Sequence, residues 1–323
     1  MAIGSLPHQD PTEACALVMD LLPEILGWPQ LPRRSPLEAM IAQCAERFPG
    51  AVVDESGVRV ERGPALEQRL AILNDDYYDG SFEAYGFSRE RASGLYTLFE
   101  SDMDAPVAVK GQLVGPITWS LAVKDGDGDP IAADHRLLDA ATKFFCLKAA
   151  WLENRLRRLC DETIIFLDEP SLHTPVLHNS PLSAKRATLL IERVLQGMGG
   201  LKGIHCCGDA DWSLLLQGSA DILSVDAYTY GESLAEHTEA LQVFLARGGS
   251  LAFGIVPARE ELLMKETTGS LMVRLEGLMD SLSKWGIRRE LLVENMLVSP
   301  ACGLVGLSEE LARRALALTA GVS

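Results

Sequence analysis

Three side chains that bind soft metals occupy consecutive positions near the middle of the sequence. The stretch GIHCCGDADW (203–212) ends an apolar run with His205, Cys206 and Cys207. Residues two apart on a β-strand point the same way, so we expect His205 and Cys207 to share one face and Cys206 to point away from it. The residues alone permit three interpretations: a metal site, a redox pair of adjacent cysteines, or ordinary core filling by buried thiols and a histidine.

Two more distant residues favour the metal interpretation. Cys302 supplies a third soft ligand, and Asp226 supplies an oxygen that would complete the coordination shell or orient a ligand. Zinc accepts imidazole, thiolate and carboxylate in a tetrahedron. A redox pair is disfavoured, because adjacent cysteines form a strained disulfide and the chain has no Cys-x-x-Cys. Core filling stays open at this point, because free cysteine commonly behaves as a small hydrophobe.

The bulk composition excludes several classes of partner. The 323 residues are 47% hydrophobic and carry a formal net charge of −16, which argues against nucleic acid, whose phosphates need clustered Lys and Arg. No apolar run reaches the length of a membrane span, and the start, MAIGSLPHQDP, is unlike a signal peptide. Seven cysteines is an odd number, so we expect reduced thiols in a cytoplasmic protein.

Short apolar runs alternate with amphipathic helical patterns along the chain. Helices are predicted at 134–160, 183–197, 232–246 and 258–285. Strands are predicted at 2–5, 25–31, 107–115, 163–170, 201–207, 221–228, 250–257 and 295–303. Eight strands separated by helices predict a single α/β domain over 1–323, a closed (β/α)8 TIM barrel. Residues 50–104 depart from the alternation and are predicted to form an insertion between strands 2 and 3, with a hairpin about Ser56–Gly57.

In such a barrel the catalytic groups come from the carboxyl ends of the strands. The predicted strand ends carry Gly4-Ser5, Asp168-Glu169, His205-Cys206-Cys207, Asp226 and Cys302-Gly303, so we expect these residues to converge on one mouth. The insertion adds residues that could reach this mouth, namely Tyr77, Tyr78, Glu83 and Tyr85. Trp28 and Trp212 are predicted to pack in the core, and His8 to be exposed.

Five short motifs occur in a defined order along the chain. They are IGSLP (3–7), VKGQLVGPITW (109–119), FLDEP (166–170), HCCG (205–208) and SPACGL (299–304). In order and spacing they resemble the catalytic half of the cobalamin-independent methionine synthase family, most of all its short, single-barrel members, the core methionine synthases. The wider superfamily also contains uroporphyrinogen decarboxylase and zinc methyltransferases that take methyl groups from corrinoid proteins.

The resemblance implies a zinc enzyme that methylates the thiol of homocysteine to give methionine. The residues that match the family's zinc ligands are His205, Cys207 and Cys302, with Asp226 near the position of its glutamate ligand. The residues that match its homocysteine site are Gly4 and Ser5, for the carboxylate, and Asp168, for the amino group. Zinc deprotonates a bound thiol, whose pKa is otherwise about 8.5, and so presents a thiolate at neutral pH.

Two departures from the family bear on the methyl donor. The full-length family enzyme has a second, N-terminal barrel that helps to bind polyglutamyl folate, whereas the first predicted strand here begins at residue 2. Where the family has a histidine near the seventh strand, proposed to protonate the folate leaving group, this chain reads FGIVP (253–257). Both departures favour a methylated corrinoid protein as donor, because Co(I) leaves without a proton.

Other functions stay open on sequence alone. A zinc methyltransferase could act on another thiol such as coenzyme M, although its sulfonate calls for cations rather than for Asp168. A uroporphyrinogen decarboxylase-like protein would need a basic cleft for a substrate with eight carboxylates. A non-enzymatic zinc-stabilised scaffold, or a module that binds corrinoid proteins, would close its zinc with four protein ligands, whereas a catalytic site keeps one position open.

Overall fold

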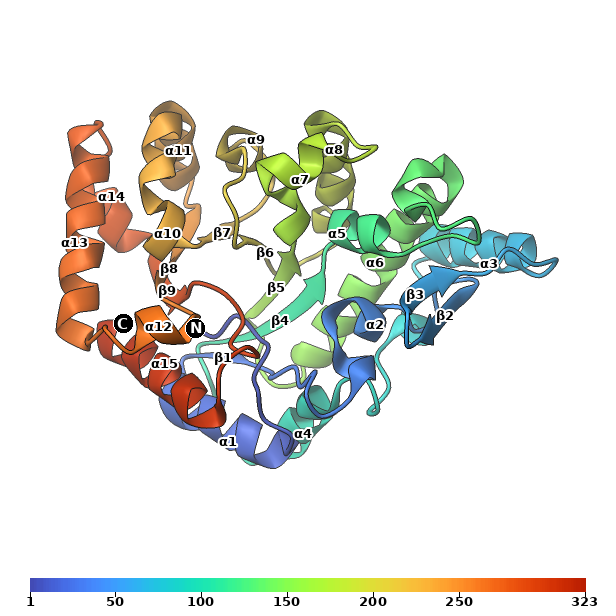
Figure 1. The fold of residues 1–323 in the computed structure, drawn as a ribbon, viewed down its shortest axis with the longest axis horizontal. Helices are drawn as coiled ribbons and strands as arrows, with labels where there is room; N and C mark the ends of the chain where they lie inside the picture. Colours follow the sequence, from blue (N-terminus) through green and yellow to red (C-terminus); the bar gives the residue numbers. More distant parts are fainter.

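The computed structural model describes residues 1–323, and its main feature is one curled sheet of seven parallel strands (Figure 1). The strand order is β1-β4-β5-β6-β7-β8-β9, so each new strand adds to the same growing edge. The bounds are β1 (Ile25–Gly27), β4 (Ala108–Val114), β5 (Thr163–Asp168), β6 (Leu201–Cys206), β7 (Ile222–Val225), β8 (Ser250–Val256) and β9 (Met296–Pro300). These strands confirm all the predicted ones except the first, and they confirm a parallel α/β architecture.

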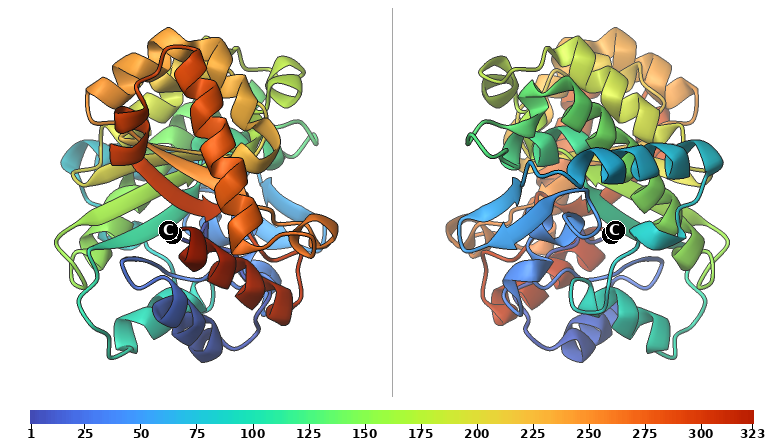
Figure 2. Two further views of the ribbon diagram at one scale, coloured as in Figure 1. Left: turned by 90° about the vertical axis from the view of Figure 1, so that its left-hand side faces the viewer. Right: turned by 90° about the vertical axis from the view of Figure 1, so that its right-hand side faces the viewer.

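Helices cover the outer side of the curl (Figure 2). The four predicted helical segments contain α6 (His135–Leu156), α8 (Ala184–Leu195), α11 (Thr238–Ala246) and α13 (Thr268–Lys284). The others around the sheet are α1 (Pro11–Leu21), α5 (Pro116–Ala122), α7 (Thr174–His178), α9 (Trp212–Leu216), α10 (Ala227–Tyr230), α12 (Glu260–Leu263), α14 (Arg289–Glu294) and α15 (Glu309–Val322). In α8 the buried positions 187, 191, 194 and 195 recur at helical spacing, which turns one apolar stripe toward the sheet. No helix combines the length and the apolar character that crossing a bilayer requires.

The connection between β1 and β4 holds the predicted insertion. It contains α2 (Met40–Cys44), the antiparallel pair β2 (Ala51–Asp54) and β3 (Gly57–Val60), α3 (Leu66–Asp79) and α4 (Ser93–Glu100). The hairpin is confirmed, but pairing of Asp54 with Gly57 places Glu55 and Ser56 in its turn, one residue earlier than predicted.

Residues 2–5 do not form the predicted first strand. The segment is extended and lies between the two edges of the sheet, but its only sheet-like pairing is a single bridge from Ser5 to Gln30. On the β1 side, the amide of Leu6 donates to the Gln30 carbonyl (2.9 Å) and the Gln30 amide donates to the Gly4 carbonyl (3.1 Å). On the β9 side, the Leu304 amide donates to the Ser5 carbonyl (2.8 Å). Regular pairing is interrupted at Gly4, whose φ of +155° lies outside the range that other residues adopt readily.

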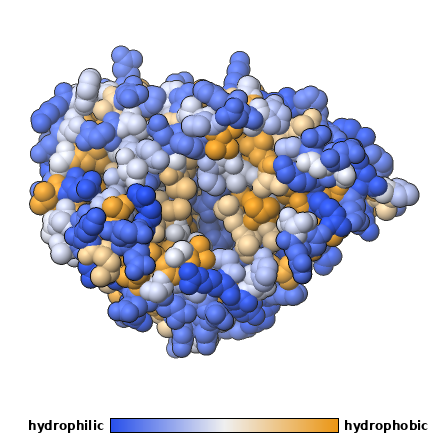
Figure 3. All heavy atoms as spheres, viewed as in Figure 1, coloured by the Kyte–Doolittle hydropathy of each residue, from blue (hydrophilic) through white to orange (hydrophobic).

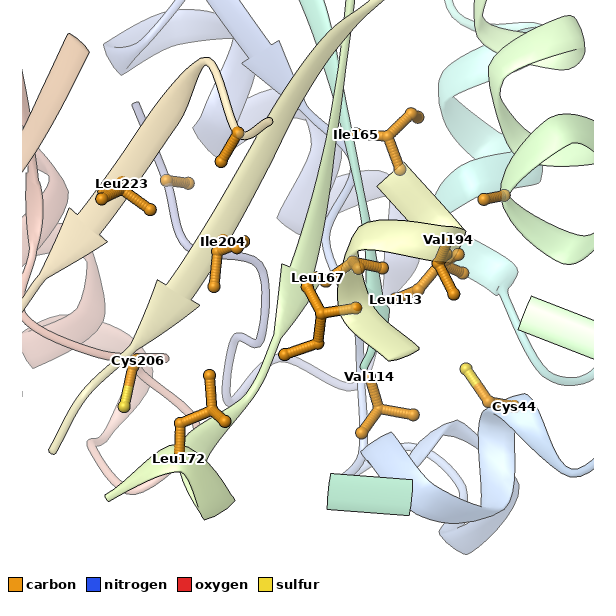
Figure 4. Close-up of a cluster of buried hydrophobic side chains, with 14 of the residues drawn as sticks. Cys44, Leu113, Val114, Ile165, Leu167, Leu172, Val194, Ile204, Cys206 and Leu223 are labelled. Atoms are coloured by element: carbon orange, nitrogen blue, oxygen red, sulfur yellow. The ribbon is translucent and has the colours of Figure 1, made fainter. Parts of the chain in front are cut away.

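Side chains on the sheet alternate between the inside of the curl and the layer beneath the helices. Inside, an apolar cluster fills one end and contains Met1, Ala108, Ile164, Phe166, Ile222 and Ala252. Outside, the larger core includes Ile165 and Leu167 of β5, Ile204 and Cys206 of β6 and Leu223 of β7 (Figure 4). The alternation therefore confirms that Cys206 points toward the helices, and it turns Asp168 and His205 toward the inside.

Candidate metal centre

The carboxyl ends of β6 and β9 bring together three residues that the sequence singled out. The ligand atoms of His205, Cys207 and Cys302 all lie within 4.8 Å of one another. His205 lies on the inner face of β6, Cys207 comes one residue after the end of that strand, and Cys302 comes two residues after the end of β9. The curl of the sheet makes neighbours of side chains that are almost a hundred residues apart in the chain.

The His205 ring is held in a defined orientation with one nitrogen left over. Its Nδ1 lies 3.0 Å from the hydroxyl of Ser224, on the inner face of β7. Its Nε2 is buried and has no hydrogen-bond partner. A buried polar atom without a partner is costly, and a metal ion would satisfy it. A second contact that fixes the ring through the other nitrogen is the usual arrangement of a metal-binding histidine.

The two thiols form an unequal pair. The neighbouring Cys302 thiol and the His205 imidazole lower the pKa of Cys207 well below that of a free thiol, which favours the thiolate. The same contact, together with burial, raises the pKa of Cys302, which keeps its proton. Two cysteine sulfur atoms and a buried imidazole nitrogen without a partner make a donor set that suits a soft or borderline ion such as zinc.

Asp226 lies next to this cluster but does not belong to it. Its carboxylate accepts a hydrogen bond from the Thr229 amide (2.9 Å) and so caps the first turn of α10. Burial raises the pKa of Asp226, and its charge interacts with Cys207 and His205. The structure therefore gives Asp226 a capping role beside the cluster and leaves three residues in the ligand group.

Asp168 projects into the same space from the neighbouring strand. It pairs in register with His205, is 8% exposed, and its Oδ1 is buried without a hydrogen-bond partner. Burial raises the pKa of Asp168, while His205 and Lys110 oppose that effect. An unpaired buried carboxylate oxygen is available to bind a cationic group of a ligand.

Gly4 and Ser5 lie against the loop that carries Cys302. A Cβ at Gly303 would come 2.0 Å from the Ser5 hydroxyl, so only glycine permits this approach. A Cβ at Gly4 would come 2.6 Å from Nε2 of Gln112 and 2.8 Å from Oε1 of Gln30. The structure thus brings all the residues predicted for the substrate, Gly4, Ser5 and Asp168, to the surroundings of the His–Cys–Cys cluster.

Several other residues that were expected near the site contact other parts of the molecule or are exposed. The Tyr85 hydroxyl donates to Asp76, Tyr77 accepts from Arg193, Glu83 pairs with Arg155, and Tyr78 is 70% exposed. Trp28 and Trp212 are buried, as predicted. His8 is only 6% exposed, which contradicts the predicted exposure, because it lies between α1 and the first turns of α15.

Three further polar residues support the site from within and were not predicted: Lys110, Gln112 and Ser224. Lys110 and Gln112 alternate with apolar residues in β4, and this i, i+2 pattern is the signal that could have placed them inside the curl. Ser224 sits in the same way between Leu223 and Val225 of β7. These polar side chains lie on the inner faces of otherwise apolar strands. They mark the boundary between the inner apolar cluster at one end of the curl and the candidate site.

Glu169 links the carboxyl ends of β4, β5 and β6 next to the site. Its carboxylate accepts from the amides of Ile117 (2.9 Å) and Thr118 (2.7 Å) and from the Thr118 hydroxyl (2.6 Å), at the first turn of α5. Its own amide donates to the carbonyl of His205 (2.8 Å). Burial raises the pKa of Glu169 to about 7 against the effect of these donors. The contacts fix the end of β5, and hence Asp168, relative to β4 and β6.

Gly115→Ala is expected to lower the free energy of unfolding by about 1–3 kcal/mol, because overpacking a buried contact typically costs this much. The added Cβ would come 2.1 Å from Oε1 and 2.2 Å from Cδ of Glu169, a carboxylate that three hydrogen bonds hold in place. Gly126→Ala is the matched control, because a Cβ there meets no atom within 4 Å. Urea unfolding measures the free energy of unfolding of both variants. Equal values would show that the Glu169 side chain can move aside without cost.

Figure 3 shows one face of the molecule. This face is hollowed near its middle, and apolar side chains gather along parts of the rim.

Comparison with solved structures relates the whole chain to proteins of one fold. A B12-independent methionine synthase from Shewanella sp., in complex with selenomethionine, superposes with a TM-score of 0.57 at 14% identity, over 97% of this chain and 86% of that one. A methyltransferase from Methanosarcina mazei superposes with a TM-score of 0.57 at 13% identity, over the same shares of the two chains. No family model and no curated protein matches the sequence. At this identity the likeness establishes a shared fold.

Proposed function

We propose that the protein is a zinc-dependent methyltransferase that methylates the thiol of homocysteine to give methionine, as a single domain formed by residues 1–323. The observation that carries the proposal is the meeting of His205, Cys207 and Cys302 within 4.8 Å, beside the unpaired carboxylate oxygen of Asp168. The shared fold with a methionine synthase and a methyltransferase supports it. So does the selenomethionine bound in the Shewanella protein, because it is the selenium counterpart of the proposed product.

The donor set fits zinc. His205 would bind it through Nε2, the buried nitrogen that lacks a partner, while Ser224 holds the ring through Nδ1. Cys207 and Cys302 would supply two sulfur ligands, which leaves one position for an acceptor thiol. Zinc lowers the pKa of a thiol that binds it and so supplies a thiolate at neutral pH.

The residues around the cluster suit the amino-acid end of homocysteine. Asp168 would bind the ammonium group through Oδ1 in a charge-assisted hydrogen bond. The Gly4–Ser5 backbone and the Ser5 hydroxyl would bind the carboxylate, and the close contact of Ser5 with Gly303 places that hydroxyl next to Cys302. These contacts would hold the acceptor sulfur in a fixed orientation for in-line attack on a methyl group.

We further propose that the methyl donor is a methylated corrinoid protein. Displacement of methyl from cobalt forms the sulfur–carbon bond and leaves both electrons of the cobalt–carbon bond on Co(I), which needs no proton. Folate as a leaving group does need one. The end of β8 offers only the buried apolar side chains of Ile255 and Val256, where the related family places a histidine.

Asp168→Asn is the experiment that tests the acceptor. The change keeps the size of the side chain and removes its charge, so homocysteine affinity is expected to fall about tenfold to a hundredfold, as for other charge-assisted contacts. Calorimetric titration of the zinc-loaded protein with homocysteine, and with coenzyme M for comparison, measures the effect. Asp161→Asn is the matched control, because Asp161 is exposed just before the same strand.

Wild-type protein is expected to bind homocysteine more tightly than coenzyme M, and both variants should keep their zinc. Unchanged homocysteine affinity in Asp168→Asn would contradict the assignment of the ammonium site. Tighter binding of coenzyme M by the wild type would contradict homocysteine as the acceptor.

A further inference from the structure

A fully buried lysine lies beneath the candidate site and has no part in the function proposed so far. Lys110 is 1% exposed and points into the curl from the middle of β4. Its Nζ donates to the carbonyl of Ile3 (2.6 Å) and to Oε1 of Gln112 (3.2 Å), and lies 4.8 Å from the centre of the Phe166 ring. Burial of an ammonium group is costly, and an apolar side chain of similar length would fill the space.

The contacts of Lys110 lead directly to the residues proposed to bind the amino-acid carboxylate. The Ile3 carbonyl immediately precedes Gly4 and Ser5. Gln112, the other acceptor, donates through Nε2 to the Trp28 carbonyl (3.0 Å) and packs against Gly4 at a distance that excludes any Cβ. The Lys110–Gln112 pair thus holds the extended segment where regular strand pairing is absent.

The charge of Lys110 also acts on Asp168. The two side chains interact electrostatically but form no ion pair, so Oδ1 of Asp168 keeps no partner. Burial lowers the pKa of Lys110 to about 8, with Asp168 opposing that effect, so the ammonium form prevails at neutral pH. The other titratable group that acts on Lys110 is the amino group of Met1, and burial lowers its pKa to about 5, so it is mostly uncharged at neutral pH. Lys110 therefore lies near Asp168 without occupying the oxygen that a ligand would use.

We propose that Lys110 is a positioning residue that makes the site selective for an amino-acid thiol: it fixes the Ile3–Ser5 backbone and leaves Oδ1 of Asp168 without a partner. This inference rests on the proposed function, because it assigns the Gly4–Ser5 and Asp168 side of the site to the amino-acid end of the acceptor. It predicts that loss of Lys110 weakens binding of the carboxylate and ammonium groups of the acceptor but does not slow methylation of the sulfur atom itself.

Lys110→Met tests the proposal by comparing two acceptors, homocysteine and 1-propanethiol, which lacks both charged groups. We expect kcat/KM for homocysteine to fall about tenfold to a hundredfold, the size of a lost charge-assisted contact, through KM more than kcat. The value for 1-propanethiol should stay within about twofold, since that acceptor makes none of these contacts. Zinc content should not change. General damage to the fold would lower kcat/KM for both thiols together. The ratio of kcat/KM for homocysteine to that for 1-propanethiol therefore distinguishes a positioning role from a loss of stability.

Lys148→Met is the matched control. Lys148 is equally buried, and its Nζ also donates to two backbone carbonyls, those of Tyr85 (3.0 Å) and Gly86 (3.2 Å), in the insertion away from the site. It should lower stability and leave the ratio of the two acceptors unchanged. Gln112→Leu is a second variant for the case in which Lys110→Met does not fold, and it should shift the ratio in the same direction. An unchanged ratio in the variants of Lys110 and Gln112 would overturn the proposal.

Hydrogen exchange provides a readout that does not need the methyl transfer. In Lys110→Met, the amides within residues 4–8, namely those of Gly4, Ser5, Leu6 and His8, should exchange at least about tenfold faster than in the wild type, because their segment loses its anchor. Amides of β6 and β7 should keep their rates, and Lys148→Met should not affect residues 4–8. If the wild-type protein methylates neither thiol, the proposed function is wrong. Hydrogen exchange still tests whether Lys110 anchors the Ile3–Ser5 segment. Unchanged exchange at residues 4–8 would overturn the anchoring role.

Discussion

Cys302→Ser is expected to lose zinc and homocysteine methylation together. The variant keeps the shape of the side chain but replaces a soft sulfur ligand by a hydroxyl that stays protonated. Residues that merely orient a metal ligand typically contribute tenfold to a hundredfold in metal affinity, so removal of a ligand should cost about a hundredfold or more. After loading with one equivalent of zinc and desalting, elemental analysis should find about one zinc per chain in the wild type and little in the variant.

Cys160→Ser is the matched control for this experiment. Cys160 is a half-buried free thiol like Cys302, but it lies after α6, where its sulfur contacts the carbonyl of Pro106. The control should retain zinc and activity. Full zinc content in Cys302→Ser would remove Cys302 from the ligand set and leave His205 and Cys207 in need of another partner.

Methylcobalamin, free or bound to a corrinoid protein, is expected to support methionine formation at least about a hundredfold faster than methyltetrahydrofolate does. A general acid typically contributes 10²–10⁴-fold, and folate cannot leave readily without one. At the end of β8 the chain presents Ile255 and Val256, neither of which donates a proton. Of the acids and bases nearby, His205 belongs to the metal cluster and Asp168 to the proposed ammonium site.

The measurement is methionine production from homocysteine with each donor offered alone, using protein prepared free of cobalamin. Val256→His is an informative second variant, because it introduces an imidazole near the position where the family that the sequence resembles has a histidine. Efficient turnover with methyltetrahydrofolate in the wild type would contradict a corrinoid donor. His8 would then be the residue to replace next, because it is a buried histidine whose Nδ1 lacks a partner.

The strand ends were predictable because alternation along a parallel strand has a simple periodicity. In β5, Ile165 and Leu167 pack beneath the helices, while Phe166 and Asp168 point inward. The same rule placed His205 and Cys207 on one face and Cys206 on the other. Given that strand ends of one parallel sheet meet at one edge, the residues of the candidate site could be named from the sequence.

The irregular pairing of residues 2–5 and the roles of the residues that support the site could not be predicted in this way. An apolar stretch such as residues 2–5 indicates an extended chain, but whether it pairs regularly depends on side chains from elsewhere, here Gln30 and Gln112 against Gly4. Asp226 stood at the expected strand end, yet its carboxylate found a nearer partner in the first turn of α10. Lys110 was overlooked because lysine is rarely buried, and only its contact with a main-chain carbonyl reveals its role.

The way the extended segment joins the two edges of the sheet has a consequence for the order of folding. Its hydrogen bonds run from Met1 to Val298 and from Leu304 to Ser5, so they close a loop of nearly the entire polypeptide. Contacts of such long sequence separation carry a large entropic cost and form slowly. Cys302 and Ser5 can therefore meet His205 and Cys207 only when the rest of the sheet is already assembled. Metal uptake during refolding should accordingly lag behind the recovery of secondary structure and report the final step.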